Sequence, residues 1–140
     1  MKNIIKAFSI FGVMIFLLFS CKTAPSTAEL NGVLRGNVRY LERIALPGDF
    51  WLEVQLVEVK PDGSAGSILA RAMTEKPTRV IPVPFMMRYS PKAVTPGSKK
   101  YGLIASIYVG KKLWFMNEKP YLVFQGKDDQ IDIIAQRVVQ

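Results

Sequence analysis

Apolar residues alternate with polar ones along most of the chain after residue 31, and this period of two constrains the fold more than any other feature. Successive side chains of a β-strand point to opposite faces, so such alternation is typical of strands with one buried side. The expected inward sets are Leu34, Val38 and Tyr40; Leu52, Val54 and Leu56; Val83, Phe85, Met87 and Tyr89; and Tyr101, Leu103, Ala105, Ile107 and Val109. Glu53 and Gln55 are expected to point outward. A weaker pattern over 67–74 and short ones over 112–116, 121–124 and 131–138 predict further strands.

Segments rich in Gly, Pro, Asp and Lys separate these strands. They read LPGD, PDGS, PKAVTPGSKK, VGKK and GKDDQ, all typical of turns and loops. No segment beyond the first twenty residues has convincing helical spacing. Residues 32–140 are therefore expected to form one all-β domain of seven or eight short strands, a sandwich or a small barrel. We predict an antiparallel β-sandwich of the immunoglobulin or transthyretin type.

The first twenty residues have the pattern of an export signal. Lys2 and Lys6 are followed by 14 uncharged residues, 7–20. As a helix this run would span about 21 Å, short of the roughly 30 Å of a bilayer's hydrocarbon core. The length instead fits the apolar core of a signal peptide. Residues 1–20 are therefore expected to be removed on export.

The chain has one cysteine, Cys21, at the end of the apolar run. The run LFSC resembles the bacterial lipobox, with Leu18 at position −3 and Ser20 at position −1. That resemblance implies cleavage between Ser20 and Cys21, a diacylglycerol thioether on the Cys21 sulfur, and an N-acyl group such as palmitate on the new amino terminus. Two or more buried chains make membrane attachment stable. An ordinary secretory signal with an incidental cysteine is the alternative.

Residues 21–31 are polar and rich in Pro, Ser and Thr, and are expected to form a lipidated tether between membrane and domain. By resemblance to enterobacterial lipoproteins, Lys22 after the acylated cysteine permits sorting to the outer membrane. The expected location is thus the outer membrane, with the domain facing the periplasm.

The remaining composition argues against most kinds of catalysis. The sequence has no histidine, and lipidation would consume the only thiol, which excludes Ser-His and Cys-His catalysis and the usual zinc sites. A hydrolase with two carboxylates is not expected, because most acidic residues fall in turns or at outward positions. Asp128 and Asp129 supply too few oxygens for calcium and fit a hairpin turn better. We predict no catalytic residue, no metal and no cofactor beyond the lipid.

The charge balance limits the possible partners. Because Lys2 and Lys6 leave with the signal segment, 17 of the 19 basic residues remain against 11 acidic ones, a net charge of +6. Such an excess favours acidic lipid, glycan or protein surfaces. Nucleic acid is not an expected partner, because export separates the protein from it.

Three stretches together resemble the YbaY/YscW family of bacterial lipoproteins, described as type III secretion lipoprotein chaperones or pilotins. They are GNVRYLERIALPGDFWLEVQLVEV, IPVPFMMRYSP with its Pro-x-Pro-Phe strand, and YGLIASIYVGKKLWF with its hairpin. The matching positions include Gly36, Val38, Tyr40, Arg43, Ile44, Ala45, Leu46, Pro47, Leu52, Val54, Leu56, Pro82, Pro84, Phe85 and Tyr89. The resemblance covers roughly residues 34–126. It implies a β-sandwich without an established catalytic site, which helps an outer-membrane component, such as a secretin, to reach or assemble in its membrane.

Several apolar residues fall opposite the expected core and are candidates for partner binding: Met86, Ile104, Tyr108, Trp114 and Phe124. A contiguous exposed apolar patch usually marks an interaction site, although loops or the opposite sheet could instead cover it. Arg43 is a sixth candidate, as a partner contact or as half of a structural salt bridge at a corner of the domain.

Two functional hypotheses follow. The first is a non-enzymatic, pilotin-like module that binds another envelope protein. The second is a binder of an envelope glycan or lipid, supported by the basic excess and by Trp51 and Trp114.

Overall fold

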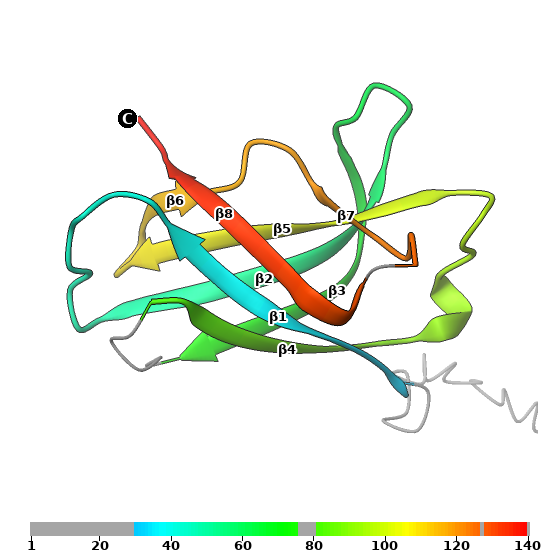
Figure 1. The fold of residues 1–140 in the computed structure, drawn as a ribbon, viewed down its shortest axis with the longest axis horizontal. Coiled ribbons are helices and arrows are strands. Elements are labelled where there is room, and N and C mark those ends of the chain that lie inside the picture. The colour runs from blue at the N-terminus through cyan, green and yellow to red at the C-terminus, as the bar shows by residue number, and fades with distance from the viewer. Residues whose placement is uncertain (1–29, 76–80, 127, 140) are drawn as a thin grey trace, which may run out of the picture.

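Eight strands and two short 3-10 helices make up the domain in the computed structural model, which describes residues 30–75, 81–126 and 128–139 (Figure 1). The strands are β1 (Gly32–Tyr40), β2 (Phe50–Val59), β3 (Ala65–Glu75), β4 (Val83–Tyr89), β5 (Lys100–Val109), β6 (Lys112–Met116), β7 (Tyr121–Val123) and β8 (Ile131–Arg137). The helices are η2 (Pro91–Ala93) and η3 (Asp128–Gln130). Every segment with predicted alternation forms a strand, so the all-β expectation is confirmed.

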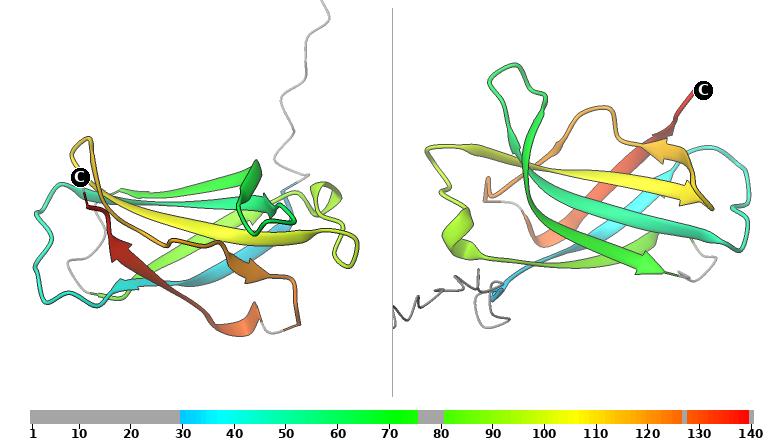
Figure 2. Two further views of the ribbon diagram at one scale, coloured as in Figure 1. Left: turned by 90° about the horizontal axis from the view of Figure 1, so that it is seen from above. Right: turned by 180° about the vertical axis from the view of Figure 1, so that it is seen from behind.

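The strands form one continuous sheet in the order β3-β2-β5-β6-β8-β1-β4, with β7 also paired to β5. The sheet curls until its two edge strands, β3 and β4, contact each other (Figure 2). The result is a nearly closed, barrel-like sheet. A short pairing of β6 with β8, through Phe115 with Arg137 and Met116 with Gln136, joins its two halves.

The sandwich prediction is therefore wrong in two respects. The sheet is barrel-like and not an immunoglobulin- or transthyretin-type sandwich, so the small barrel is the alternative that the structure bears out. The sheet is also not wholly antiparallel, because β1 and β8 run parallel, with Gly36 opposite Ile131 and Tyr40 opposite Ala135. Alternation along a strand indicates which residues face inward, but it does not indicate which strands become neighbours or in which direction they pair.

One apolar core fills the inside of the barrel. Its largest fully buried side chains come from strands throughout the sheet and include Tyr101, Phe115, Leu52, Leu56, Met87, Leu103, Ile107, Ile131 and Ile133. The rings of Tyr40 and Phe115 stack with centroids 4.5 Å apart, which packs β1 against β6 across the interior. The inward sets predicted from the sequence are confirmed, with Tyr89 and Val109 half-buried at strand ends.

A buried amide holds β5 to the connection that leads into β7. Asn117, directly after β6, accepts a hydrogen bond at Oδ1 from the Ala105 N–H at 2.7 Å. Its Nδ2 donates to the carbonyls of Leu103 at 2.9 Å and Lys119 at 2.7 Å. This buried polar side chain therefore has its amide oxygen and nitrogen satisfied by backbone groups.

The predicted signal segment, the cleavage site at Ser20 and Cys21, and nearly all of the tether lie outside the described residues. In the part of the chain that is described, no helix is long and apolar enough to cross a membrane.

Candidate protein-binding surface

The outer side of β2, β3, β5 and β6 carries apolar side chains that the register brings together. Directly paired residues of neighbouring strands point to the same side of a sheet. Trp51 lies opposite Tyr108, and Tyr108 lies opposite Leu113. Met73 lies opposite Glu53, and Ile104 lies opposite Gln55, both on the same outward-pointing set. We call Trp51, Met73, Ile104, Tyr108 and Leu113 the apolar outer face.

These side chains are accessible to different degrees. Met73 is 57% exposed, while Trp51, Ile104, Tyr108 and Leu113 are half-buried. No described segment packs across them as a second layer (Figure 2). Of these five residues, Trp51, Tyr108 and Leu113 are direct cross-strand neighbours, whereas Glu53, Gln55 and Ser106 share the same side and lie between them and Met73 or Ile104. The strip is therefore apolar at the Trp51 end and mixed further along, on a side of the sheet where polar side chains are the usual occupants.

Two aromatic rings at one end of this strip are held rigidly. The rings of Trp51 and Tyr108 stack with centroids 4.2 Å apart and an interplanar angle of 8°. The Trp51 Nε1 donates a hydrogen bond to the Gly110 carbonyl at 2.9 Å. Gly110 lies in the tight turn between β5 and β6 with φ of 58°, a conformation that glycine adopts without steric cost. Rigid aromatic side chains lose little conformational entropy when a partner binds, so this pair is suited to anchor one.

A carboxylate interrupts the strip. Glu53 points outward, as predicted, but it is only 8% exposed because it lies between neighbours on β3 and β5. Its Oε1 lies 3.7 Å from Nη1 of Arg71, which is the ion pair that the structure gives it. Glu53 and Arg71 together place one charged pair inside an apolar surface. A partner segment that crosses the strip would have to match them with polar groups.

The structure brings together only two of the residues predicted to bind a partner. Ile104 and Tyr108 lie on the apolar outer face. Met86 is 52% exposed on β4, where it lies opposite Arg35; β4 contacts β3 where the sheet closes, so Met86 lies beyond the β3 edge of the apolar outer face. The sequence pattern alone does not place Met73 and Leu113 on the same side of the sheet as Ile104 and Tyr108, because that placement depends on strand pairing.

Trp114 and Phe124 are half-buried and pack against the core, so neither is fully open to a partner. Trp114 falls at an irregularity in the β5–β6 pairing, and the Arg137 guanidinium lies 5.4 Å from the centre of its ring. Phe124 has φ of 62° and its ring lies 5.3 Å from Tyr89 and 5.9 Å from Tyr101, between centroids. The positive φ of Phe124 turns its side chain toward Tyr89 and Tyr101, on the face opposite to the one that alternation predicts.

Arg43 is exposed in the connection between β1 and β2 and makes no described ion pair. The salt bridge at this corner of the domain is made by its neighbour instead, since Glu42 lies 3.4 Å from Arg137. Ile44 and Leu46 pack against the core, as expected for residues that close the end of the domain. Arg43 itself remains a predicted partner contact.

The phenol of Tyr40 ties this corner down. Its hydroxyl donates a hydrogen bond to the Ile44 carbonyl at 2.6 Å. Burial raises the pKa of Tyr40 above its ordinary value, because the charged phenolate is poorly solvated there.

The acidic pair near the carboxyl end, Asp128 and Asp129, begins the 3-10 helix η3 in the connection between β7 and β8. Asp128 accepts hydrogen bonds from the Phe124 N–H at its two carboxylate oxygens, at 2.8 and 3.0 Å. Among the described residues there is no cluster of three or more His, Cys, Asp or Glu side chains suited to a metal ion. The predicted hairpin turn is wrong, because β7 pairs with β5 whereas β8 pairs with β1 and β6, so the two strands that flank the acidic pair are not neighbours.

A family model and a solved structure are similar to this chain. Residues 31–134 match the family model described as "Type III secretion system lipoprotein chaperone (YscW)". A solved structure of an alternative pilotin from the type II secretion system of Vibrio cholerae is similar with a TM-score of 0.68 and 25% sequence identity, over 78% of this chain and 98% of that one. No curated protein sequence matches the chain. Since the family model spans well over half of the sequence, this chain belongs to the YscW family of lipoprotein chaperones.

Proposed function

We propose that the protein is a lipoprotein of the outer membrane, anchored through Cys21, that binds another envelope protein through its apolar outer face. The single observation that carries the proposal is an uncovered apolar strip on a β-sheet, in a chain whose family is named for chaperones. A component of a secretion system, such as a secretin, is the client we favour, since the family is named for one secretion system and the similar pilotin belongs to another.

The physical basis of client binding is burial of the apolar outer face. Burying apolar surface contributes roughly 25 cal/mol per Å². The stacked pair of Trp51 and Tyr108 offers a preformed anchor, and Met73 offers a flexible side chain that adapts to irregular surfaces. Glu53 and Arg71 would select a client with complementary polar groups at that point of the strip.

Two exposed methionines make a matched test of this surface. Met73 is 57% exposed on β3 within the apolar outer face, and Met86 is 52% exposed on β4 outside it. Met73→Lys should reduce client binding about tenfold or more, because a charge would be buried in the contact. Met86→Lys should leave binding unchanged. The measurement is crosslinking between the lipoprotein and its secretin in cells, together with the amount of assembled secretin in the outer membrane.

Equal effects of the two substitutions would contradict the assignment of the apolar outer face. Unfolding would be recognised separately, because both variants should keep the β-sheet circular-dichroism spectrum of the parent chain.

The anchor has its own test. Cys21→Ser should abolish acylation and move the protein from the membrane fraction to the soluble periplasmic fraction. Mass spectrometry of the processed protein should show the diacylglycerol and N-acyl additions only in the parent. A Cys21→Ser variant that stays in the membrane with the parent's mass would refute the anchor.

A further inference from the structure

A basic groove of about 600 Å³ lies at the end of the barrel where β1 begins. The connections β2–β3, β4–β5 and β6–β7 form its walls. We define the groove by its lining residues. Its four lysines are Lys60, Lys99, Lys100 and Lys119. Its apolar floor consists of Val59, Pro61, Pro120 and Leu122. The lysines are exposed, and Leu122 is 41% exposed between them.

Backbone turns fix the walls of the groove. The β2–β3 turn is closed by the Lys60 N–H, which donates to the Ser64 carbonyl at 2.9 Å. Asp62 in that turn accepts hydrogen bonds from the N–H and hydroxyl of Ser64, which lower the pKa of Asp62. Its carboxylate is thus engaged within its own turn.

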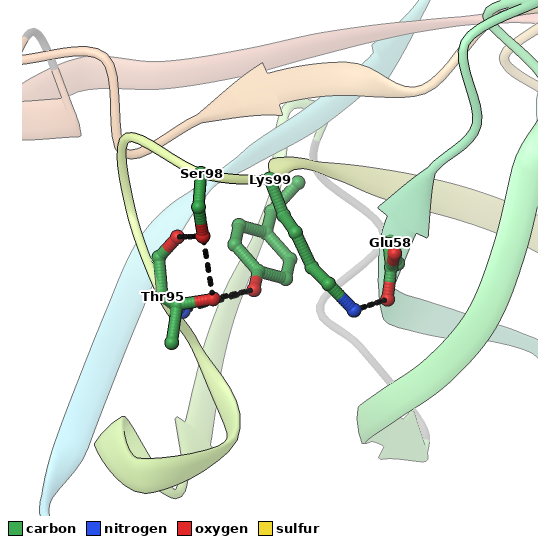
Figure 3. A network of polar contacts seen from close by, with 5 residues as sticks. Glu58, Thr95, Ser98 and Lys99 are labelled. Atoms are coloured by element: carbon green, nitrogen blue, oxygen red, sulfur yellow. Dashed lines mark hydrogen bonds and ion pairs between the residues drawn. The ribbon is translucent and has the colours of Figure 1, made fainter.

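The opposite wall is held by a small polar network (Figure 3). The hydroxyl of Tyr101 accepts a hydrogen bond from the Thr95 N–H at 2.9 Å, and Ser98 donates from its hydroxyl to the Thr95 carbonyl at 3.2 Å. Lys99 lies 3.1 Å from the half-buried Glu58, between Nζ and Oε2. The turn therefore presents its lysines from a fixed backbone.

The charges of the groove do not cancel. Glu58 is the acidic residue among its lining residues, and it pairs with Lys99. In the described part of the chain Lys60, Lys100 and Lys119 have no ion-pair partner. The charged Asp62 in the neighbouring turn interacts electrostatically with Lys60, while Lys100 and Lys119 remain without an ion-pair partner among the described residues, so the groove keeps a net positive charge around an apolar floor.

The β2–β3 turn and the start of β5, which supply lining residues of the groove, lie at the same end of the barrel as the start of β1 (Figure 1). Gly32 pairs with Tyr89 at the end of β4, and Val59 at the end of β2 pairs with Lys100 at the start of β5. The proposed tether of residues 21–31 has eleven residues, with a root-mean-square span of about 18 Å if it is flexible. An acylated Cys21 would thus hold this end, and not the opposite one, close to the bilayer.

We propose that the basic groove docks onto the anionic phospholipid headgroups of the membrane that carries the anchor. Lipid phosphates provide the charge that the three lysines require, and Leu122 and Pro120 can contact the apolar part of the interface. The inference rests on the proposed anchor, since the tether brings the groove within range. At physiological salt the electrostatic attraction decays over about 8 Å, and each lysine near an anionic surface contributes about fivefold to binding.

The test uses the processed, acylated protein reconstituted in vesicles of phosphatidylcholine alone or with 30% phosphatidylglycerol. With Cys21 acylated, a cysteine introduced at exposed Ala65, at the groove end, or at exposed Ala45, at the opposite end, takes a single dye. Energy transfer to a headgroup-labelled lipid reports the distance to the surface. The Ala65→Cys signal should exceed the Ala45→Cys signal, and the excess should grow with phosphatidylglycerol and fall at 0.5 M salt.

The variant Lys60→Gln/Lys100→Gln/Lys119→Gln should remove the dependence on phosphatidylglycerol, and Lys111→Gln/Lys112→Gln at the opposite end should not. The triple variant keeps the ion pair between Lys99 and Glu58, and Asp62 keeps its hydrogen bonds from Ser64. Equal transfer in both vesicle types, or transfer unchanged by the triple variant, would overturn the proposal. A triple variant that loses its protein client but keeps the vesicle signal would assign the groove to an acidic protein instead.

Failure of the anchor would be visible as a different result. Unacylated protein would not float with phosphatidylcholine vesicles at all. Flotation with phosphatidylglycerol vesicles would then be the readout, and the triple variant should weaken it about a hundredfold if the groove binds headgroups. No loss on triple substitution would overturn the proposal in that case too.

Discussion

Replacing Asn117 should destabilise the barrel more than any surface change, because one side chain satisfies three backbone groups. Asn117 is 6% exposed. In Asn117→Ala the Ala105 N–H loses its acceptor, and the carbonyls of Leu103 and Lys119 lose a donor. A buried polar group left without a partner costs about 1–3 kcal/mol. The Lys119 carbonyl is nearer to solvent, so two buried groups set the scale, and the expected loss is about 2–4 kcal/mol.

The loss is measurable by urea unfolding followed through tryptophan fluorescence, with Trp51 and Trp114 as probes. Asn117→Asp keeps an acceptor for the Ala105 N–H but loses both donors and places a negative charge beside two carbonyls. It should therefore be no more stable than Asn117→Ala. The exposed neighbour is the control, since Glu118→Ala should change stability by no more than about 0.5 kcal/mol.

A loss below about 1 kcal/mol in Asn117→Ala, with an unchanged dependence on urea, would refute this reasoning. It would mean that water or a rearranged loop replaces the amide. The same substitution should also loosen the connection that carries Lys119, so hydrogen exchange of the Ala105 amide should accelerate with it.

Two further predictions concern the corner and the parallel pair of strands. In Gly36→Ala the new Cβ would lie 2.5 Å from the Ile131 carbonyl oxygen and 2.7 Å from the Ile131 Cβ, so β1 and β8 must separate; we expect a loss of about 2–3 kcal/mol in urea unfolding. The pKa of Tyr40 is raised in the folded state. The stabilisation that protonated Tyr40 gives the folded state is therefore fully present below about pH 10 and is lost as the pH rises through the raised pKa. The free energy of unfolding should be lower at pH 11 than at pH 8, and Tyr40→Phe should make this difference smaller.

The inward faces of the strands could be predicted from the sequence because burial on one side dictates alternation. The strand predicted over residues 112–116 has the bounds of β6, and Val83, Phe85 and Met87 are buried as expected. These features depend on local pattern alone. The joining of the two halves of the sheet depends on the pairing of β6 with β8 through only two residue pairs, and no local pattern marks them.

The candidate surface could be predicted only in part for the same reason. Ile104 and Tyr108 belong to one strand, so their shared outward direction follows from spacing. Met73 and Leu113 join them only through the register of neighbouring strands. The prediction for Phe124 is wrong because its positive φ reverses the side that spacing assigns, and the sequence carries no glycine at that position to signal it.

The positions of the two proposed surfaces are mutually compatible. Both include β2 and β5, and along β5 the basic groove begins at Lys100 whereas the stacked Tyr108 lies eight residues further. At about 3.3 Å per residue, Tyr108 lies about 26 Å from the groove end, well beyond the screening length of the membrane charge. Headgroup contact at one end would therefore leave the Trp51 and Tyr108 anchor in the periplasm and able to receive a client. If instead the strip lay on the bilayer, Met73→Lys would weaken membrane contact before client binding, and the vesicle and crosslinking measurements would fall together.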